Sequence, residues 1–343
     1  MKINQKEIAK RVGVSQTTVS FVLNNKKEVK ISPETRKKII EVAEEIGYRK
    51  FYIPVEEGFK TGNIGYIFPF KSSLQDPYYH RFYSGVLEGV EDKNLNLILY
   101  KLKNCEEILY RIDILKKVDG LIIEEKINDE IVEKIKDKIP IVLLNHKTEK
   151  ISCDCVMPDN KGGIIKAIEY LFRKGHRNIG IFGMKPLFVH TKERLDGYIE
   201  GMKLFGLKIK DEYISLPERK IGGIKELNEY AIKTLKDWFK LKERPTATVT
   251  FGDVYALSLI GMAQKVKIRI PDDLSIIGFD NIINCLYSHP TLTSIEQPLE
   301  QMGKKAVNLL IERIKNPDKR IEKVIFEVEL IERESVKDMN ERR

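Results

Sequence analysis

Short apolar segments rich in β-branched residues recur through residues 63–280, and segments of helical length lie between them. The strand-like segments are IGYIF (64–68), LILY (97–100), GLIIE (120–124), IVLL (141–144), NIGIF (178–182), TATVT (246–250) and LSIIGF (274–279). Helices are expected at 78–93, 105–117, 129–137, 161–174, 192–205, 224–239 and 253–264. Continuously apolar strands alternating with helices predict an α/β fold of doubly wound parallel sheets. Some 280 residues are too many for one such sheet, so we expect two similar lobes.

The first 50 residues have a different pattern, which predicts three short helices. Asn4 is a candidate N-cap with Glu7 in a capping box, and Ser15 can cap the second helix. Ser32-Pro33-Glu34 is a strong start signal for the third. Gly13 and Gly47 are expected to end the first and third helices. The expected apolar faces are Ile8, Ala9 and Val12; Val19, Val22 and Leu23; and Ile39, Ile40, Val42, Ala43 and Ile46.

The net charge of +9 is concentrated at the N-terminus. Residues 1–50 carry twelve basic and six acidic side chains, which is two-thirds of the excess in a seventh of the chain. This asymmetry favours a polyanionic partner such as nucleic acid, although a solvated basic surface would also account for it.

Several classes of protein are disfavoured by what the sequence lacks. No apolar run approaches the roughly 18 residues of a membrane span, and the N-terminus has no apolar signal segment, so we expect a cytoplasmic protein. Four cysteines are too few for a disulfide framework, and Cys153 and Cys155 are expected to be neighbouring, partly buried thiols. Catalytic and phosphate-binding motifs are missing and the histidines lack metal-ligand spacing, so no cofactor or metal is expected. His176 is expected to stabilise a turn.

Polar and aromatic side chains follow the predicted strands, where ligands bind in open α/β sheets. They are Asp76, Tyr78, Tyr79, Asn145, His146, Arg194, Asp253 and Asp280. Aromatic faces, carboxylates, an amide and an arginine suit a small polar ligand. The alternative is that strand-end loops are polar in any fold of this kind.

Ala9, Gly13 and Val19 have the spacing of a helix-turn-helix. With the flanking words, the chain resembles the LacI/GalR family of bacterial transcriptional regulators. The matching words are IAKRVGVSQTTVSFVLN (8–24), ISPETRKKIIEVAEEIGYR (31–49), VDGLII (118–123), GHRNIGIFG (175–183), ERLDGY (193–198), IPDDLSIIGFDN (270–281) and PTLTSIEQP (290–298).

This resemblance implies an all-α helix-turn-helix domain at residues 1–50, a hinge at 51–62 and a two-lobed core at 63–343, similar to periplasmic sugar-binding proteins. We expect the first lobe at about 63–160 and 292–320, and the second at about 161–291 and 321–336. It also implies a homodimer, or a tetramer of paired dimers, that binds a pseudo-palindromic operator in double-stranded DNA of the bacterial nucleoid. A small effector would set the operator affinity.

By family position, Gln16 and Thr17 are base readers, because Gln pairs with adenine and Thr touches a thymine methyl. Phe21 stands where the family often has arginine, so we expect the operator to differ from the commonest operators of the family. Ser15, Thr18 and Ser20 are expected to contact phosphate or to cap helices. The candidate phosphate partners among the basic residues, each of which could instead be solvated, are Lys2, Lys6, Lys26, Lys27 and Arg49.

The hinge differs from the family pattern. Many members carry a segment that folds on DNA and inserts leucine into the minor groove. Here residues 51–60 read FYIPVEEGFK, in which Pro54 opposes a helix and Glu56-Glu57 would face phosphate. Either the hinge helix is short or this protein does not kink its operator, and we favour the second.

In the effector pocket, Arg194 and Asp280 match family positions that hold the ligand. Tyr78 and Tyr79, which follow Asp76, match family positions with aromatic residues. Asp253 matches the second residue of an Asn-Asp pair whose first residue is Gly252 here. Asn145-His146 replaces a frequent Asp-Arg. These changes favour a larger sugar or a nucleoside over a typical hexose, although His146 could instead bind backbone.

The resulting hypothesis is a repressor in which effector binding closes the lobes and changes the spacing of paired DNA-binding domains. The alternatives are a solute-binding protein of the same lobed fold, and a sugar- or nucleoside-processing enzyme with Asp253 and Asp280 as its acid and base.

Overall fold

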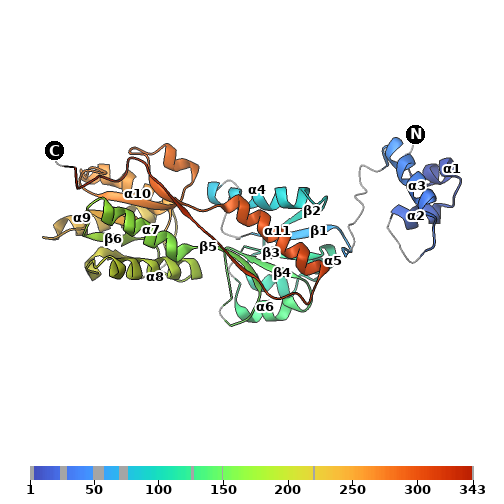
Figure 1. The fold of residues 1–343 in the computed structure, drawn as a ribbon, viewed down its shortest axis with the longest axis horizontal. Coiled ribbons are helices and arrows are strands. Elements are labelled where there is room, and N and C mark those ends of the chain that lie inside the picture. Colours follow the sequence, from blue (N-terminus) through green and yellow to red (C-terminus); the bar gives the residue numbers. More distant parts are fainter. Residues whose placement is uncertain are drawn as a thin grey trace.

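The computed structural model describes residues 4–23, 29–48, 58–68, 76–124, 127–148, 150–218 and 221–341. These form an N-terminal helical bundle and a core of two α/β lobes (Figure 1). No helix among the described residues is long and apolar enough to cross a membrane.

The N-terminal bundle has the three expected helices, α1 (Gln5–Val12), α2 (Gln16–Leu23) and α3 (Pro33–Glu45). Asn4 caps α1 by accepting a hydrogen bond from the Glu7 amide, and Gly13 ends it with a φ of 77°, a conformation that glycine adopts without strain. The expected apolar faces meet in one cluster, with Ile8, Val19 and Ile39 fully buried.

Of the expected hinge, residues 58–62 are described. The backbone amides of Lys60, Thr61 and Gly62 donate to the Asp119 carboxylate over 2.7–3.0 Å. This carboxylate anchors the chain where it enters the core. Pro54 and Glu56-Glu57 lie outside the described residues.

The first lobe is built on a fully parallel sheet with the strand order β11-β5-β4-β3-β1-β2. Its strands are β1 (Asn63–Ile67), β2 (Asn96–Tyr100), β3 (Gly120–Ile123), β4 (Ile141–Leu144), β5 (Asp154–Pro158) and β11 (Lys323–Phe326). Its helices are α4 (Pro77–Glu91), η2 (Cys105–Leu109), α5 (Ile112–Lys117), α6 (Asp129–Lys136) and α11 (Leu299–Lys315). The helix expected over 105–117 is therefore a 3₁₀ turn followed by a short α-helix.

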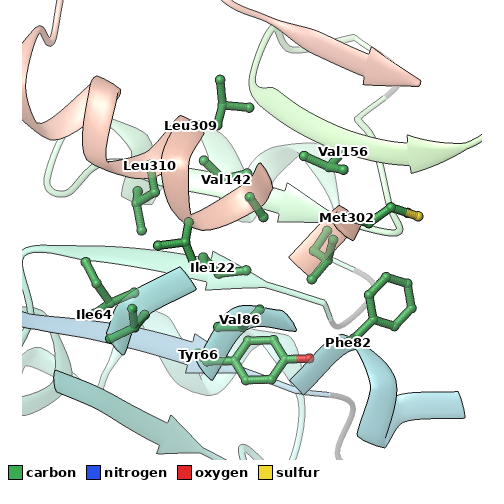
Figure 2. Packing of buried hydrophobic residues seen from close by; sticks show 14 of the residues in the cluster. Ile64, Tyr66, Phe82, Val86, Ile122, Val142, Val156, Met302, Leu309 and Leu310 are labelled. Carbon is green, nitrogen blue, oxygen red and sulfur yellow. The ribbon is translucent and has the colours of Figure 1, made fainter. Parts of the chain in front are cut away.

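Helices α4 and α11 pack together over one face of this sheet (Figure 2). Phe82 and Val86 of α4 and Met302, Leu309 and Leu310 of α11 are buried against strand residues. A Cβ atom at Gly85 would lie 2.0 Å from the carbonyl oxygen of Glu300, so glycine is needed where the helices cross. The opposite face is covered by a second apolar cluster that includes α5 and α6.

The second lobe has the strand order β12-β10-β9-β8-β6-β7, in which β12 is antiparallel to β10. Its strands are β6 (Ile179–Phe182), β7 (Ile214–Ser215), β8 (Ala247–Thr250), β9 (Ser275–Asp280), β10 (Thr293–Glu296) and β12 (Glu329–Ile331). Helices α7 (Asn160–Arg173) and α8 (Val189–Leu204) cover one face, and α9 (Ile224–Lys240) and α10 (Asp253–Ala263) cover the other. Short 3₁₀ turns are η3 (Asp211–Tyr213), η4 (Gln264–Val266) and η5 (Ile283–Leu286).

The chain passes between the lobes after β5, after β10 and after β11. The expected lobe boundaries are wrong at two strands. Residues 293–296 pair with β9 in the second lobe, and residues 323–326 pair with β5 in the first. Because β10 pairs with β9 and β11 pairs with β5, the chain crosses between the lobes near Gln297 and near Glu327.

The cysteines described are buried as expected, whereas the His176 ring contacts distant segments instead of its own turn. Cys153, Cys155 and Cys285 are buried free thiols. The His176 ring is buried and bonds to the Thr246 hydroxyl at 2.9 Å and the Lys337 carbonyl at 3.1 Å. It therefore fastens the C-terminal segment to the second lobe.

Candidate functional sites: a DNA-reading helix and a cleft between the lobes

The N-terminus of α2 is presented to solvent. Ser15 Oγ accepts from the Thr18 amide at 3.0 Å and lies 2.8 Å from the Thr18 hydroxyl, which confirms Ser15 as the cap. Gln16 and Thr17 are exposed beside this cap, while Val19 points into the bundle. The first turn of α2 thus exposes an amide and a hydroxyl, side chains able to read base edges.

The other predicted DNA-binding residues are more scattered. Lys6 is exposed on α1, and Ser20 and Phe21 are partly buried on α2. Lys2, Lys26, Lys27 and Arg49 lie outside the described residues.

The expected effector site lies between the lobes, and we call it the cleft. On the first lobe it has Tyr78, at the start of α4, and Asn145, just after β4. Asp76 caps α4 by accepting from the Tyr78 amide at 3.0 Å, so it orients the helix that carries Tyr78 and Tyr79. Asn145 has a φ of 58° and donates from Nδ2 to the Tyr78 hydroxyl at 2.9 Å. The Asn145 Oδ1 atom is buried and accepts no hydrogen bond from the described residues.

The second-lobe side is centred on Arg194 of α8, which is 3% exposed. Its Nε donates to Asn160 Oδ1 at 3.0 Å, and its Nη1 donates to the Phe251 carbonyl and lies 3.5 Å from Asp280 Oδ1. The guanidinium stacks over the Phe279 ring at 3.7 Å. These contacts hold the Arg194 plane in one orientation.

Asp280 ends β9 with a φ of 118° and accepts from Gln297 Nε2 at 2.6 Å. Burial raises the pKa of Asp280 to about 8, and Arg194 counteracts only part of that shift. The Gln297 Oε1 atom is buried and accepts no hydrogen bond within the described part of the chain. Asp280, which is unfavourable to ionise in this buried position, thus lies between Arg194 on one side and Gln297 on the other.

Asp253 has a different position from that of a ligand contact. It is fully buried, and its oxygens accept from Ser294 Oγ (2.6 Å), the Ile282 amide (2.8 Å) and the Cys285 thiol (3.1 Å). Burial raises its pKa to about 6, while these donors favour the ionised form. Asp253 therefore ties α10 to the segment after β9, behind the cleft.

His146 is also directed at backbone, which was the alternative left open by the sequence. Its ring is 8% exposed, and Nε2 lies 2.9 Å from the Ile127 carbonyl. Tyr79 is partly buried and packs edge-on against Tyr78, with ring centroids 5.2 Å apart.

Sequence reasoning missed Tyr66, Glu124, Asn160 and Gln297. The Tyr66 hydroxyl donates to Glu124 Oε2, and both side chains are buried at the carboxyl ends of β1 and β3. Glu124 did carry a signal, since it is a charged residue that ends a continuously apolar strand. Asn160 and Gln297 carried none, because they lie where the chain changes lobe.

The lobes touch through two kinds of contact. Tyr78 packs against apolar clusters of both lobes, and Lys147 of the first lobe forms a 2.5 Å ion pair with Glu193 of the second. Glu193 also accepts from Asn160 Nδ2 at 3.0 Å, and Asn160 accepts from Arg194. Thus Lys147, Glu193, Asn160, Arg194 and Asp280 form a continuous polar chain across the interface.

Comparison with known proteins identifies the family of both parts of the chain. Residues 4–50 match the bacterial regulatory proteins of the lacI family, and residues 168–336 match a periplasmic binding protein-like domain. The chain is 30% identical to the HTH-type transcriptional repressor PurR of Photobacterium profundum, over 98% of this chain and 99% of that protein. The chain belongs to the lacI family. A probable repressor ExuR of Bacillus subtilis is 29% identical over 97% of this chain and 98% of its own length.

Solved structures of lacI-family regulators have the same fold. A regulator from Enterococcus faecalis with bound ribose superposes with a TM-score of 0.67 at 28% identity, over 81% of this chain and 100% of that one. The CelR–cellobiose complex superposes with a TM-score of 0.71 at 22% identity, over 97% of this chain and 99% of that one. This lacI-family member is therefore an effector-controlled, DNA-binding transcriptional regulator and not an enzyme, so the hypothesis of an Asp253–Asp280 acid–base pair is wrong.

Proposed function

We propose that this regulator is a repressor whose effector is a small ring compound rich in hydroxyl groups, a sugar or a nucleoside, bound between Tyr78–Asn145 and Arg194–Asp280. The observation that carries the proposal is the excess of hydrogen-bond acceptors in this cleft. Asn145 Oδ1 and Gln297 Oε1 are buried without a donor from the described residues, and Gln297 Nε2 donates to the carboxyl group of Asp280.

Such a cleft selects for donors on the ligand, because a buried acceptor without a partner costs about 1–3 kcal/mol. Hydroxyl groups of a sugar would satisfy Asn145, Gln297 and Asp280 together. Arg194 would donate to a ring or anomeric oxygen, and the Tyr78 and Tyr79 rings offer apolar faces. Ribose bound to the Enterococcus faecalis regulator, at 28% identity, agrees with this class.

We also propose a homodimer, which an exposed apolar patch on the second lobe supports. Val254, Ile283, Leu286 and Tyr287 are 46–75% exposed. Their segments are joined by the bonds of Asp253 to Ile282 and Cys285. Paired chains would place two copies of α2 on half-sites about 34–36 Å apart, or a multiple of that distance, in a pseudo-palindromic operator. The operator places the protein in the bacterial cytoplasm, on the nucleoid.

Effector control would follow from the polar chain between the lobes. An effector held by Tyr78 on one side and Arg194 on the other binds best at one lobe angle, so it shifts the population toward that angle. In a dimer this changes the separation of the two DNA-binding domains.

The first experiment is to capture sheared genomic DNA on the purified protein, with and without a mixture of sugars and nucleosides. Recovery of a short inverted repeat supports the repressor, and a change in recovery shows whether the effector releases or strengthens binding. Failure to enrich any sequence at moderate salt would contradict the proposal.

Calorimetric titration with the active compound then tests the site. Arg194→Gln should abolish binding. Arg177→Gln removes a guanidinium stacked on Phe172 at the surface and should leave affinity unchanged. Equal affinity in both variants would place the effector elsewhere.

A further inference from the structure

A cavity of about 660 Å³ lies beside the first crossing between the lobes. It is lined by Lys147, Thr148, Cys155, Met157, Pro158, Asp159, Asn160, Lys161, Val189, Lys192, Glu193, Lys323 and Ile325, and we call it the flank cavity. None of the predicted effector residues lines it. Its volume is within the range of sites for small organic ligands.

The floor of the flank cavity is apolar and continuous with the first-lobe core. Lys323 and Ile325 of β11 pair with Cys155 and Met157 of β5, so these four side chains lie on one face of the sheet. Cys155 and Met157 are buried, whereas Ile325 is 66% exposed. Val189, at the start of α8, packs against the same cluster from the second lobe. An exposed isoleucine inside a concave, two-lobed cavity is suited to an apolar ligand group.

The rim of the cavity is basic. Four lysines surround the floor, Lys147, Lys161, Lys192 and Lys323, against two carboxylates, Asp159 and Glu193. Asp159 Oδ1 is occupied in capping α7, where it accepts from the Gly162 amide at 2.8 Å. Lys161 forms a 2.5 Å pair with Glu200, which is outside the lining. Lys147 is likewise paired with Glu193. Counted as formal charges, the lining still has four lysines against two carboxylates around its apolar floor.

From this arrangement we propose that the flank cavity binds a small organic anion, a carboxylate or phosphate group carried on an apolar body. The anionic group lies among Lys147, Lys192 and Lys323, and the apolar body lies on Met157, Val189 and Ile325. Charge-assisted hydrogen bonds from ammonium groups supply the specificity, and burial of Ile325 adds affinity.

The site is placed to influence the effector cleft. Its anion competes with Glu193 for Lys147, and these two residues form an ion pair between the lobes. Glu193 holds Asn160, and Asn160 holds Arg194. Because the lining comes from both lobes, the anion has different affinities at different lobe angles and acts as a second effector.

The test is calorimetric titration of the full chain with phenyl phosphate and with benzoate, each compared with inorganic phosphate and phenol. We expect one site per chain for at least one organic anion, with inorganic phosphate and phenol each weaker by about tenfold or more. The phenyl phosphate and benzoate arms distinguish a phosphate from a carboxylate ligand. No saturable binding of either, or equal binding of inorganic phosphate, would overturn the proposal.

Variants place the binding in the flank cavity. Lys323→Glu and Ile325→Asp should each weaken binding by about tenfold, and Lys236→Glu, an equal charge change on the exposed face of α9, should not. Glu193→Gln should strengthen binding, because it releases Lys147 for the anion. An affinity that is unchanged in Lys323→Glu, or reduced equally in Lys236→Glu, would refute the site. None of these measurements requires the sugar effector or the operator, so they stand apart from the proposed function.

Discussion

The Nη1 atom of Arg194 lies 3.5 Å from Oδ1 of Asp280, yet burial still raises the pKa of Asp280 to about 8. Desolvation of the carboxylate thus outweighs the attraction of the guanidinium. A buried carboxyl group that is unfavourable to ionise is typical of a binding site, because a ligand can donate hydrogen bonds to it.

Asp280→Asn should make the effector-free protein more stable at alkaline pH. The folded pKa is raised above the unfolded value of about 4, so the folded state holds the extra proton and stability is lost as pH rises from about 4 to 8. Asparagine removes this loss and keeps an acceptor for Gln297. Urea unfolding at pH 8 should show a gain of about 1–3 kcal/mol, which shrinks toward pH 5.

The matched control is Asp318→Asn, which changes an exposed carboxylate. It should leave the unfolding free energy unchanged at both pH values. If Asp280→Asn were no more stable than the wild type at pH 8, the cost of burying this carboxylate would be disproved.

Most of the fold could be predicted from the sequence, because the spacing of apolar residues and the composition of each segment indicate which side chains are buried. All seven apolar segments form strands, and the three N-terminal helices and their faces are confirmed. Among the strands that were missed, β7 and β12 have only two and three residues. The strands β5 and β10 are buried, but polar residues such as Asp154 and Thr293 interrupt their apolar runs. In β11, Lys323 and Ile325 are exposed, so the strand lacks the continuous apolar signal of β3.

The cleft was less predictable, because position after a strand does not fix the direction of a side chain. Arg194 and Asp280 do meet, as do Tyr78 and Asn145. Asp253 also follows a strand, but Gly278 of the neighbouring strand leaves room for its carboxylate to turn inward. A Cβ atom there would lie 2.1 Å from Asp253 Oδ1. That space is created by packing between strands and has no local sequence signal.

Removal of the Ser294 hydroxyl should be costly, because this group makes two hydrogen bonds, one of which it accepts from the Asn281 amide at 3.1 Å. Ser294 Oγ donates to Asp253 Oδ1 at 2.6 Å, and both residues are fully buried. Ser294→Ala leaves that charged oxygen without its donor, so we expect a loss of about 2–3 kcal/mol in the unfolding free energy.

Ser258→Ala is the comparison, since Ser258 donates to a neutral amide, Asn228 Oδ1, at 2.8 Å. It should cost about 1 kcal/mol. Equal losses for the two variants would mean that Asp253 is protonated or solvated in the folded protein.

His176 should make the second lobe sensitive to acid. Burial lowers its pKa to about 4, although the Lys337 carbonyl and Asp338 favour the charged form. The unfolded chain therefore binds a proton first, and stability falls as pH drops from about 6.5 to 4. His176→Gln should flatten the pH dependence of the unfolding free energy by up to about 1.4 kcal/mol per pH unit in this window. His80→Gln, at an exposed position of α4, should leave it unchanged, and the same flattening there would contradict the assignment to His176.

Gln16 and Lys6 are both exposed on the N-terminal bundle, but their replacement by alanine should change DNA affinity in different ways. Gln16 is a proposed base reader at the start of α2, so Gln16→Ala should cost about 1–3 kcal/mol on the selected operator and nothing on random DNA. Lys6 carries charge without base-edge geometry, so Lys6→Ala should weaken both equally and reduce the salt dependence by about one counterion. Fluorescence anisotropy on operator and scrambled duplexes at three salt concentrations separates the operator-specific loss of affinity from the salt-dependent loss. A uniform, salt-dependent loss for Gln16→Ala would make Gln16 a phosphate contact and leave Thr17 to read the bases.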